Sequence, residues 1–297
     1  MKRVFCIVLT VLLLVGMACT VSSPAVAEVV PLPLDQTVPG NTPIAENFTE
    51  TSYEDESISV SYEESKASGV RTYIMRIKIA DPSQIRTAMS NDSYDDRTYV
   101  KAATMATHVN AIAAVNGDFF KYFYDIGYVV RQGVFYRDKL NGERDVLIID
   151  DRGDFHAVRN ATSESMAAYL ADEFPADRTV INTFTLGPVL VENGEVQEIT
   201  TREFQYRYKM QRVAIIQLGE LEYAIVECNG KADASAGMSM STFAEYIQSL
   251  FPDCLLAYNL DGGGSTNVIF NGKRIHKNTD ARNISDILYF ASAAGEN

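Results

Sequence analysis

The chain has 297 residues, of which 46% are hydrophobic and 10% aromatic, and this composition excludes a wholly disordered chain. The formal net charge of −13 excludes the extended basic surface that nucleic-acid binding requires, and it disfavours binding to an anionic membrane. The length allows one large domain or two small ones.

The first 27 residues are predicted to be a signal peptide. Lys2 and Arg3 form a basic start, residues 4–18 are apolar, and residues 25–27 (Ala-Val-Ala) are a small-x-small cleavage site. The apolar run is shorter than a typical membrane-spanning helix, although an uncleaved anchor is the alternative. The segment therefore predicts export to a secreted or cell-envelope location, without stable membrane insertion after cleavage.

Residues 28–57 are predicted to be a linker. The stretch contains four prolines followed by a run of acidic residues, and it lacks apolar periodicity. It would hold the following domain away from a membrane or cell wall, or it would be a disordered spacer without a role. Residues 58–297 are then the folded domain.

From residue 58 onward, short alternating segments predict more strands than helices. Strands are expected over residues 57–62, 73–79, 111–115, 255–260, 267–270 and 287–291, and hairpins over 127–136, 189–196 and 213–227. Helices are expected within 97–109, over 163–174 and from Ser239 onward. The pattern predicts an α+β fold, with a mixed, largely antiparallel sheet and helices packed on it.

Two cysteines, Cys228 and Cys254, lie outside the predicted signal peptide. An oxidising compartment would permit a disulfide between them, and two separate buried thiols are the alternative. With no CxxC motif and only three histidines, the chain is not expected to hold a structural zinc ion.

The first motif with chemical character is residues 113–120, Ala-Ala-Val-Asn-Gly-Asp-Phe-Phe. An apolar strand runs into an Asn-Gly turn, which by itself is an ordinary hairpin signal. Here two phenylalanines follow and should be buried. They would hold Asp118 at the edge of the core, where a carboxylate is costly unless it is paired or functional.

The second motif is the glycine loop, residues 261–266, Asp-Gly-Gly-Gly-Ser-Thr, which follows an apolar strand. Glycines allow positive φ angles and a close approach to a ligand. Successive N–H groups in such a turn can form an anion-binding nest, which would suit a phosphate oxygen. A flexible loop is the alternative, but an aspartate at the strand end makes the pattern more specific.

Local cations would be needed to bind an anionic substrate in a chain this acidic, and arginine binds phosphate bidentately. One group precedes the strand at 213, and the other follows the glycine loop: Arg207, Lys209 and Arg212, then Lys273, Arg274, His276, Lys277 and Arg282. Arg212 is predicted to be functional. Lys273, Arg274 and Lys277 are better explained as a charged strand edge.

A serine hydrolase is the weaker alternative. The chain has no P-loop and no GxSxG motif, although Ser265 with His108, His156 or His276 could in principle form a triad. A lone histidine in a helix, strand or surface loop is usually not catalytic, so a carboxylate enzyme is preferred.

At these motifs the chain resembles the phosphodiester glycosidase family. The matching segments follow the family order: residues 113–120, 184–194, 212–215, 237–241, 259–266 and 282–287. The resemblance covers about residues 95–293. One departure is Asn229-Gly230-Lys231, where the family often has Asp-Gly-Arg, and it bears on the substrate and on any metal site.

The resemblance implies an exported hydrolase that cleaves the bond between a sugar and a phosphodiester in a cell-surface or extracellular glycan. Asp118, Asp261 and Arg212 would be catalytic, the two carboxylates doing acid–base or electrostatic work. The residues that would bind the substrate are Asn116, Gly117, Gly262, Gly263, Gly264, Ser265, Thr266, Asn229 and Arg282. A phosphate leaving group needs little protonation, so one carboxylate with a cationic clamp would suffice, and no cofactor would be required.

Two alternatives keep the same residues. In the first, Ca²⁺ or Mg²⁺ binds oxygen ligands from Asp118, Asp261, Asn116 and Asn229, and the protein is a metal-dependent phosphodiesterase. In the second, the protein is a non-catalytic glycan-binding module. The catalytic hypothesis requires Asp118, Arg212 and Asp261 to converge on one cleft.

Overall fold

The computed structural model describes residues 29–121, 126–199, 206–230, 237–276 and 281–294. The predicted signal peptide lies outside the described residues. Within these ranges, no helix is long and apolar enough to cross a membrane.

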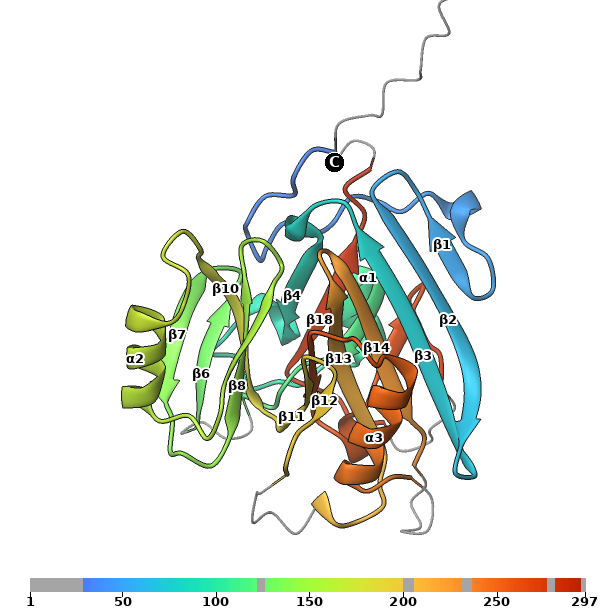
Figure 1. The fold of residues 1–297 in the computed structure, drawn as a ribbon. Coiled ribbons are helices and arrows are strands. Elements are labelled where there is room, and N and C mark those ends of the chain that lie inside the picture. The colour runs from blue at the N-terminus through green and yellow to red at the C-terminus, as the bar shows by residue number, and fades with distance from the viewer. Residues whose placement is uncertain (1–28, 122–125, 200–205, 231–236, 277–280, 295–297) are drawn as a thin grey trace, which may run out of the picture.

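The largest sheet has eight strands in the order β1-β2-β3-β14-β13-β15-β11-β12. Helix α3 (Met240–Leu250) covers its outer face, in front of β13 and β14 in Figure 1. Ser239 caps this helix, since its hydroxyl accepts a hydrogen bond from the Thr242 N–H. The strands are β1 (Ser52–Glu54), β2 (Ile58–Ala67), β3 (Val70–Ile79), β11 (Val189–Glu192), β12 (Glu195–Val196), β13 (Arg212–Gly219), β14 (Glu222–Cys228) and β15 (Leu256–Asn259).

A second sheet packs on the inner face of the first. It has five strands in the order β17-β16-β5-β18-β4, and helix α1 (Ala102–His108) covers its far side. Val115 and Leu288 of this sheet share one buried cluster with Ile215 of the first sheet. The strands are β4 (Ile85–Met89), β5 (Ala111–Asn116), β16 (Val268–Phe270), β17 (Lys273–Arg274) and β18 (Asp286–Ala291).

A third group of elements lies beside the two sheets, on the left in Figure 1. It comprises a three-stranded sheet, a hairpin and helix α2. The hairpin joins the sheet through side chains, because the hydroxyls of Thr185 and Thr183 accept hydrogen bonds from the N–H groups of Tyr128 and Val130. The elements are β6 (Gly127–Arg131), β7 (Val134–Lys139), β8 (Asp145–Asp150), β9 (Phe155–Val158), β10 (Val180–Leu186) and α2 (Ser163–Asp172).

The α+β class is confirmed. Every ladder between the named strands is antiparallel in the described residues, and short 3-10 helices connect several of them. These helices are η1 (Ala45–Asn47), η2 (Pro82–Gln84), η3 (Ser90–Asp92) and η5 (Gly263–Ser265).

The segment expected to be a linker is packed on the domain over residues 29–57. The buried Arg86 guanidinium donates hydrogen bonds to the carbonyls of Pro33, Asp35 and Val38 at 3.0–3.1 Å. Leu32 is buried in the cluster beneath α1. The same segment also contacts the residues after β18, because the Asn41 N–H donates a hydrogen bond to the Ser292 carbonyl. Proline-rich composition here reflects an irregular but docked segment, whose polar backbone is satisfied by the domain.

The predicted disulfide between Cys228 and Cys254 is wrong, because both are free, buried thiols. Cys228 ends β14 opposite Arg212, whereas Cys254 precedes the start of β15. Since β13 is antiparallel to both neighbours, the two cysteines lie at opposite ends of the sheet. Burial raises the pKa of the Cys228 thiol to about 12 and that of Cys254 to about 11.

We therefore expect the protein without residues 1–27 to carry two free thiols. Ellman's reagent should titrate about two per chain in denaturant and far fewer in the native state, because the thiols are buried. Dithiothreitol should leave the melting temperature unchanged. A melting temperature that falls on reduction would show that a disulfide stabilises the fold.

Candidate active site

Two of the predicted motifs meet where β5 and β15 end. Asn116, the last residue of β5, donates a hydrogen bond from its side chain to the Asp261 carbonyl at 2.8 Å. Its side-chain oxygen accepts from the Asn267 N–H at 2.9 Å. One asparagine thus joins the Asn-Gly-Asp turn to both ends of the glycine loop, and the two motifs form one site.

The glycine loop packs directly on the start of β13. Gly263 has a φ of 60° and donates its N–H to the Gln211 carbonyl at 3.0 Å. A Cβ on Gly262 would lie 2.8 Å from that same oxygen, so the close approach requires glycine. The N–H groups of Ser265 and Thr266 also bond inside the loop. These three N–H groups are therefore engaged, and they do not form the open anion nest that the sequence suggested.

The positive charge at the glycine loop comes instead from the side chain of Arg282. The Arg282 guanidinium donates to the Ser265 hydroxyl at 2.7 Å, and the Arg282 N–H donates to the Gly264 carbonyl at 2.8 Å. Arg282 is exposed. The loop therefore presents a fixed positive charge and a hydroxyl beside Asp261, a pair that suits a phosphate oxygen.

Asp261 is partly exposed, yet its pKa is raised from 3.8 to about 6. Desolvation by the surrounding protein is the main cause. Hydrogen bonding to Ser265 and the charge of Arg282 oppose the rise, while the negative charge of Asp118 adds to it. Asp118 and Asp261 are therefore within electrostatic range, and Asp261 exchanges its proton close to neutral pH.

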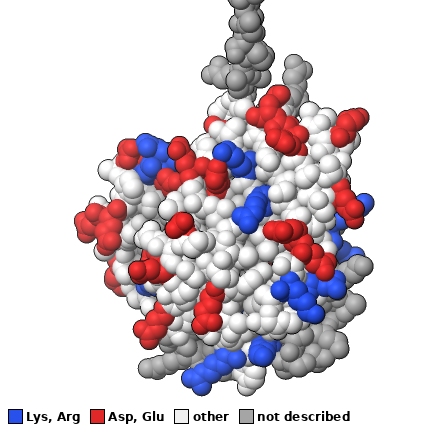
Figure 2. Space-filling view, turned by 45° about the vertical axis from the view of Figure 1, so that its right-hand side comes forward, with Lys and Arg blue, Asp and Glu red and all other residues white. Residues whose placement is uncertain are grey.

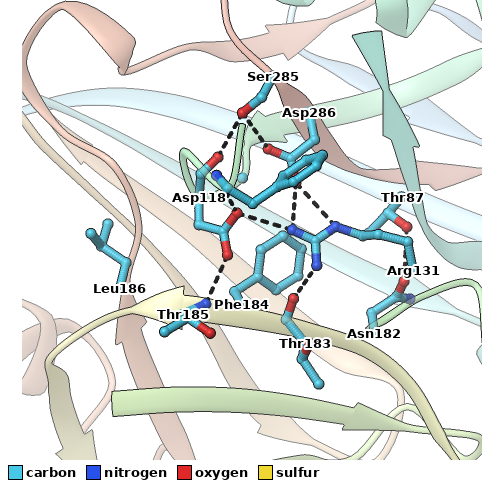
Figure 3. Close-up of polar contacts among 12 residues, drawn as sticks. Thr87, Asp118, Arg131, Asn182, Thr183, Phe184, Thr185, Leu186, Ser285 and Asp286 are labelled. Atoms are coloured by element: carbon cyan, nitrogen blue, oxygen red, sulfur yellow. Dashed lines mark hydrogen bonds and ion pairs between the residues drawn. The ribbon is translucent and has the colours of Figure 1, made fainter. Parts of the chain in front are cut away.

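Asp118 itself is buried and faces protein donors (Figure 3). One carboxylate oxygen accepts from Arg131 at 3.0 Å and from the Phe120 N–H at 3.2 Å. The other accepts from the Thr185 N–H at 2.8 Å. Both oxygens of Asp118 are thus engaged by the protein.

Arg131 and Asp286 complete this cluster, and sequence reasoning missed both. The fully buried Arg131 guanidinium holds one oxygen of Asp286 with two hydrogen bonds, at 2.7 and 3.1 Å, and also bonds to the Thr183 carbonyl. The central carbon of the Arg131 guanidinium lies 4.5 Å from the centre of the Phe184 ring. The one available signal was an aspartate opening the otherwise apolar strand 286–291.

Asp286 and Asp118 are both paired with the guanidinium of Arg131. Burial raises the pKa of Asp286 above its ordinary value, the charge of Arg131 opposes the rise, and the charge of Asp118 adds to it. Gly117 packs against this carboxylate, since a Cβ there would lie 2.5 Å from an Asp286 oxygen. The glycine of the Asn-Gly-Asp turn is thus required by Asp286 and not only by the turn.

A family model for phosphodiester glycosidases matches residues 109–291, which is more than half of the chain. The chain belongs to the phosphodiester glycosidase family. The match includes Asn116, Asp118, Arg131, Asp261 and Asp286, so the whole site lies within the family domain.

Solved structures show the same fold. The catalytic domain of zebrafish N-acetylglucosamine-1-phosphodiester alpha-N-acetylglucosaminidase, auto-inhibited by its pro-peptide, aligns with a TM-score of 0.63 at 16% identity, covering 79% of this chain and 83% of that one. A hypothetical protein from Synechocystis aligns with a TM-score of 0.54 at 16% identity, covering 79% of this chain and 62% of that one. No curated protein matches the sequence.

Within this phosphodiester glycosidase domain, Arg212 lies level with Asp261, because β13 pairs Ala214 with Asn259 and the Leu260 N–H donates to the Val213 carbonyl. Its guanidinium donates to the carbonyls of Met238 and Tyr208, at 3.3 and 3.1 Å. Side chains alternate along a strand, so Arg212 shares a face with Ala214, which packs under α3. Burial lowers the pKa of Arg212 to about 10. The structure brings the two carboxylates of the predicted trio within electrostatic range, and the strand register places Arg212 level with Asp261.

Some of the remaining predicted residues lie beside the two aspartates, and others do not. Gly117, Gly264, Ser265, Thr266 and Arg282 lie with Asp118 and Asp261. Asn229 follows β14, and its N–H donates to the Arg71 carbonyl at 2.8 Å. Arg207 and Lys209 are exposed, Lys273 is exposed on β17, and Lys277 lies outside the described residues.

Two of the four predicted metal ligands, Asp118 and Asn116, are engaged by protein donors. Both Asp118 oxygens accept from cationic or N–H donors, and the Asn116 oxygen accepts from a backbone N–H. In the part of the chain that the structure describes, no group of three or more His, Cys, Asp or Glu side chains could hold a metal. Hard cations need such oxygens free, so Asp118 and Asn116 are poorly placed to bind one.

A serine triad is also disfavoured. The Ser265 hydroxyl bonds to Arg282, and each of the three histidines lies beside a carboxylate of its own. These pairs are His108 with Asp92, His156 with Asp150 and His276 with Glu227. A serine nucleophile needs a histidine within hydrogen-bond distance to take its proton.

Proposed function

We propose that the protein is an exported hydrolase that cleaves the bond between a sugar and a phosphodiester in an extracellular glycan, releasing the sugar and a phosphomonoester. Family membership supports a phosphodiester glycosidase. The single observation that carries the proposal is the arrangement at the glycine loop, where the partly exposed Asp261 lies beside Arg282 and Ser265.

In this proposal Arg282 and Ser265 bind the phosphate oxygens, and Asp261 activates the attacking water. A phosphate group needs little protonation to leave, so a base is required more than an acid. A carboxylate whose pKa is raised to about 6 is a stronger base than an ordinary aspartate and is still ionised at neutral pH. Because the ionised form acts, the rate should rise with pH through about 6.

Local charge matters because the chain as a whole repels anions. On the face in Figure 2, acidic and basic side chains are interspersed, with Lys and Arg most frequent toward the lower edge. An anionic substrate is therefore bound by particular cations such as Arg282, rather than attracted by the net field of the protein.

The test is turnover of a panel of sugar-1-phosphodiesters in ¹⁸O-labelled water, followed by phosphorus NMR. Glycosidic cleavage places the label on the sugar, and the phosphomonoester signal stays unshifted. An isotope shift in that signal would show cleavage at phosphorus and favour the phosphodiesterase alternative. Binding without turnover of any compound would favour a glycan-binding module.

A further inference from the structure

The Asp118 carboxylate faces into the protein. Its three hydrogen bonds, from Arg131 and from the N–H groups of Phe120 and Thr185, occupy both oxygens. The side chain is 2% exposed. Both oxygens of this carboxylate are thus bonded within the protein and shielded from solvent, which disfavours proton exchange with a substrate.

We infer that Arg131 and Asp286 are positioning residues, which lock Asp118 inward so that it acts on Asp261 through its charge, while Asp261 alone exchanges a proton with the reacting water. This inference rests on the proposed function, and it assigns different roles to the two carboxylates that sequence reasoning treated alike.

Three residues hold Asp118 inward: Arg131, Asp286 and Ser285 (Figure 3). Arg131 ends β6 and bridges the two aspartates, with Asp286 at the start of β18. The Ser285 hydroxyl donates to the Asp118 carbonyl at 3.0 Å, which fixes the turn from the other side. Asp118 is therefore held through its side chain and its backbone at once.

In this cluster two carboxylates share one guanidinium, which leaves a net negative charge. Arg131 is shared between Asp118 and Asp286, so it does not fully compensate Asp118. The buried Lys121 also contributes, since Asp286 has the largest effect of the acids that act on its charge, but its amino group bonds to Ser90. The residual negative charge at Asp118 then makes Asp261 a stronger base.

The test compares the pH dependence of kcat/KM in Asp118→Asn, Asp286→Asn and the wild type. Asp261 faces Asp118, Arg282 and Ser265, and Asp286 faces Arg131, Asp118, Lys121 and Ser285. Asp118→Asn should lower kcat roughly tenfold and move the acid limb roughly 0.5–1 pH unit lower. Asp286→Asn should move the limb in the same direction, because Arg131 then compensates Asp118 in full.

Asp150→Asn is the matched control. Asp150 is equally buried and is paired with Arg178 at 2.7 Å and His156 at 3.0 Å, in the third group of elements. It should lower the melting temperature without moving the limb. An unmoved limb in Asp286→Asn would overturn the inference, as would loss of turnover in Asp118→Asn as complete as in Asp261→Asn.

A second measurement separates this inference from the proposed function. NMR of ¹³C-labelled aspartate can follow the Asp261 carboxyl directly, even if no compound is turned over or Asp118→Asn does not fold. Its titration should move to lower pH in Asp286→Asn and stay unchanged in Asp150→Asn. An unchanged Asp261 titration in Asp286→Asn would refute the electrostatic role of the cluster.

Discussion

Replacing Asp261 with Asn should lower kcat by roughly 10²–10⁴ and leave the fold intact. Asn keeps the shape of the side chain but cannot accept the proton from water. The folded-state pKa of Asp261, about 6, lies above its ordinary value of 3.8, so its ionisation destabilises the fold as pH rises through that interval. Asn does not ionise, and above pH 6 the variant should be at least as stable as the wild type.

Both kcat and melting temperature should be measured on one preparation at pH 7.5. Asp253→Asn is the control, since Asp253 is exposed before the start of β15, at the end away from the glycine loop. A variant Asp261→Asn that loses stability but keeps its rate per folded molecule would show that Asp261 only forms the turn. The chemistry would then lie elsewhere in the site.

Replacing Arg131 with Met should lower the free energy of unfolding by about 3–5 kcal/mol, because it leaves two buried carboxylates without their cation. The side chains of Arg131, Asp118 and Asp286 are at most 2% exposed. Urea denaturation at pH 7.5 measures the loss. Acidification should restore part of it, since protonating Asp286 removes one of the uncompensated charges.

Two comparisons make the second prediction specific. Arg152→Met removes a surface pair, with side chains 56% and 68% exposed, and should cost no more than about 1 kcal/mol. Adding Asp118→Asn and Asp286→Asn to Arg131→Met should recover stability, because the buried charges are then gone. Equal losses in Arg131→Met and Arg152→Met would mean that the buried cluster contributes little.

Local patterns in the sequence predicted much of the fold. The hairpin at 213–227, the buried strand at 111–115 and the helix capped by Ser239 all occur close to the expected residues. Strands β8 and β10 were not predicted. Strand β4 was not predicted either. It is buried throughout and lacks the alternation of a half-buried strand, so its sequence offered no period-2 signal.

The site was predictable where its chemistry is contiguous in sequence. The Asn-Gly-Asp turn and the glycine loop are short motifs, and a single asparagine joins them in the structure. Arg131 was missed because its partners are 13 and 155 residues away and nothing near it in sequence suggests a charge cluster. The position of Arg212 beside the loop was predictable, but its hydrogen bonds to the carbonyls of Met238 and Tyr208 were not.

The docked N-terminal segment has a consequence for the order in which the molecule can fold. The Asn41 side chain donates to the Ala294 carbonyl, so contacts join residues 253 apart in the sequence. Strand β18, the last strand among the described residues, pairs with both β4 and β5. A chain that emerges N-terminus first cannot complete these contacts until residues 286–294 are free, and non-local pairing of this kind slows folding. Until then the edges of β4 and β5 that β18 covers stay unpaired, so the emerging chain is exposed to aggregation until β18 is available.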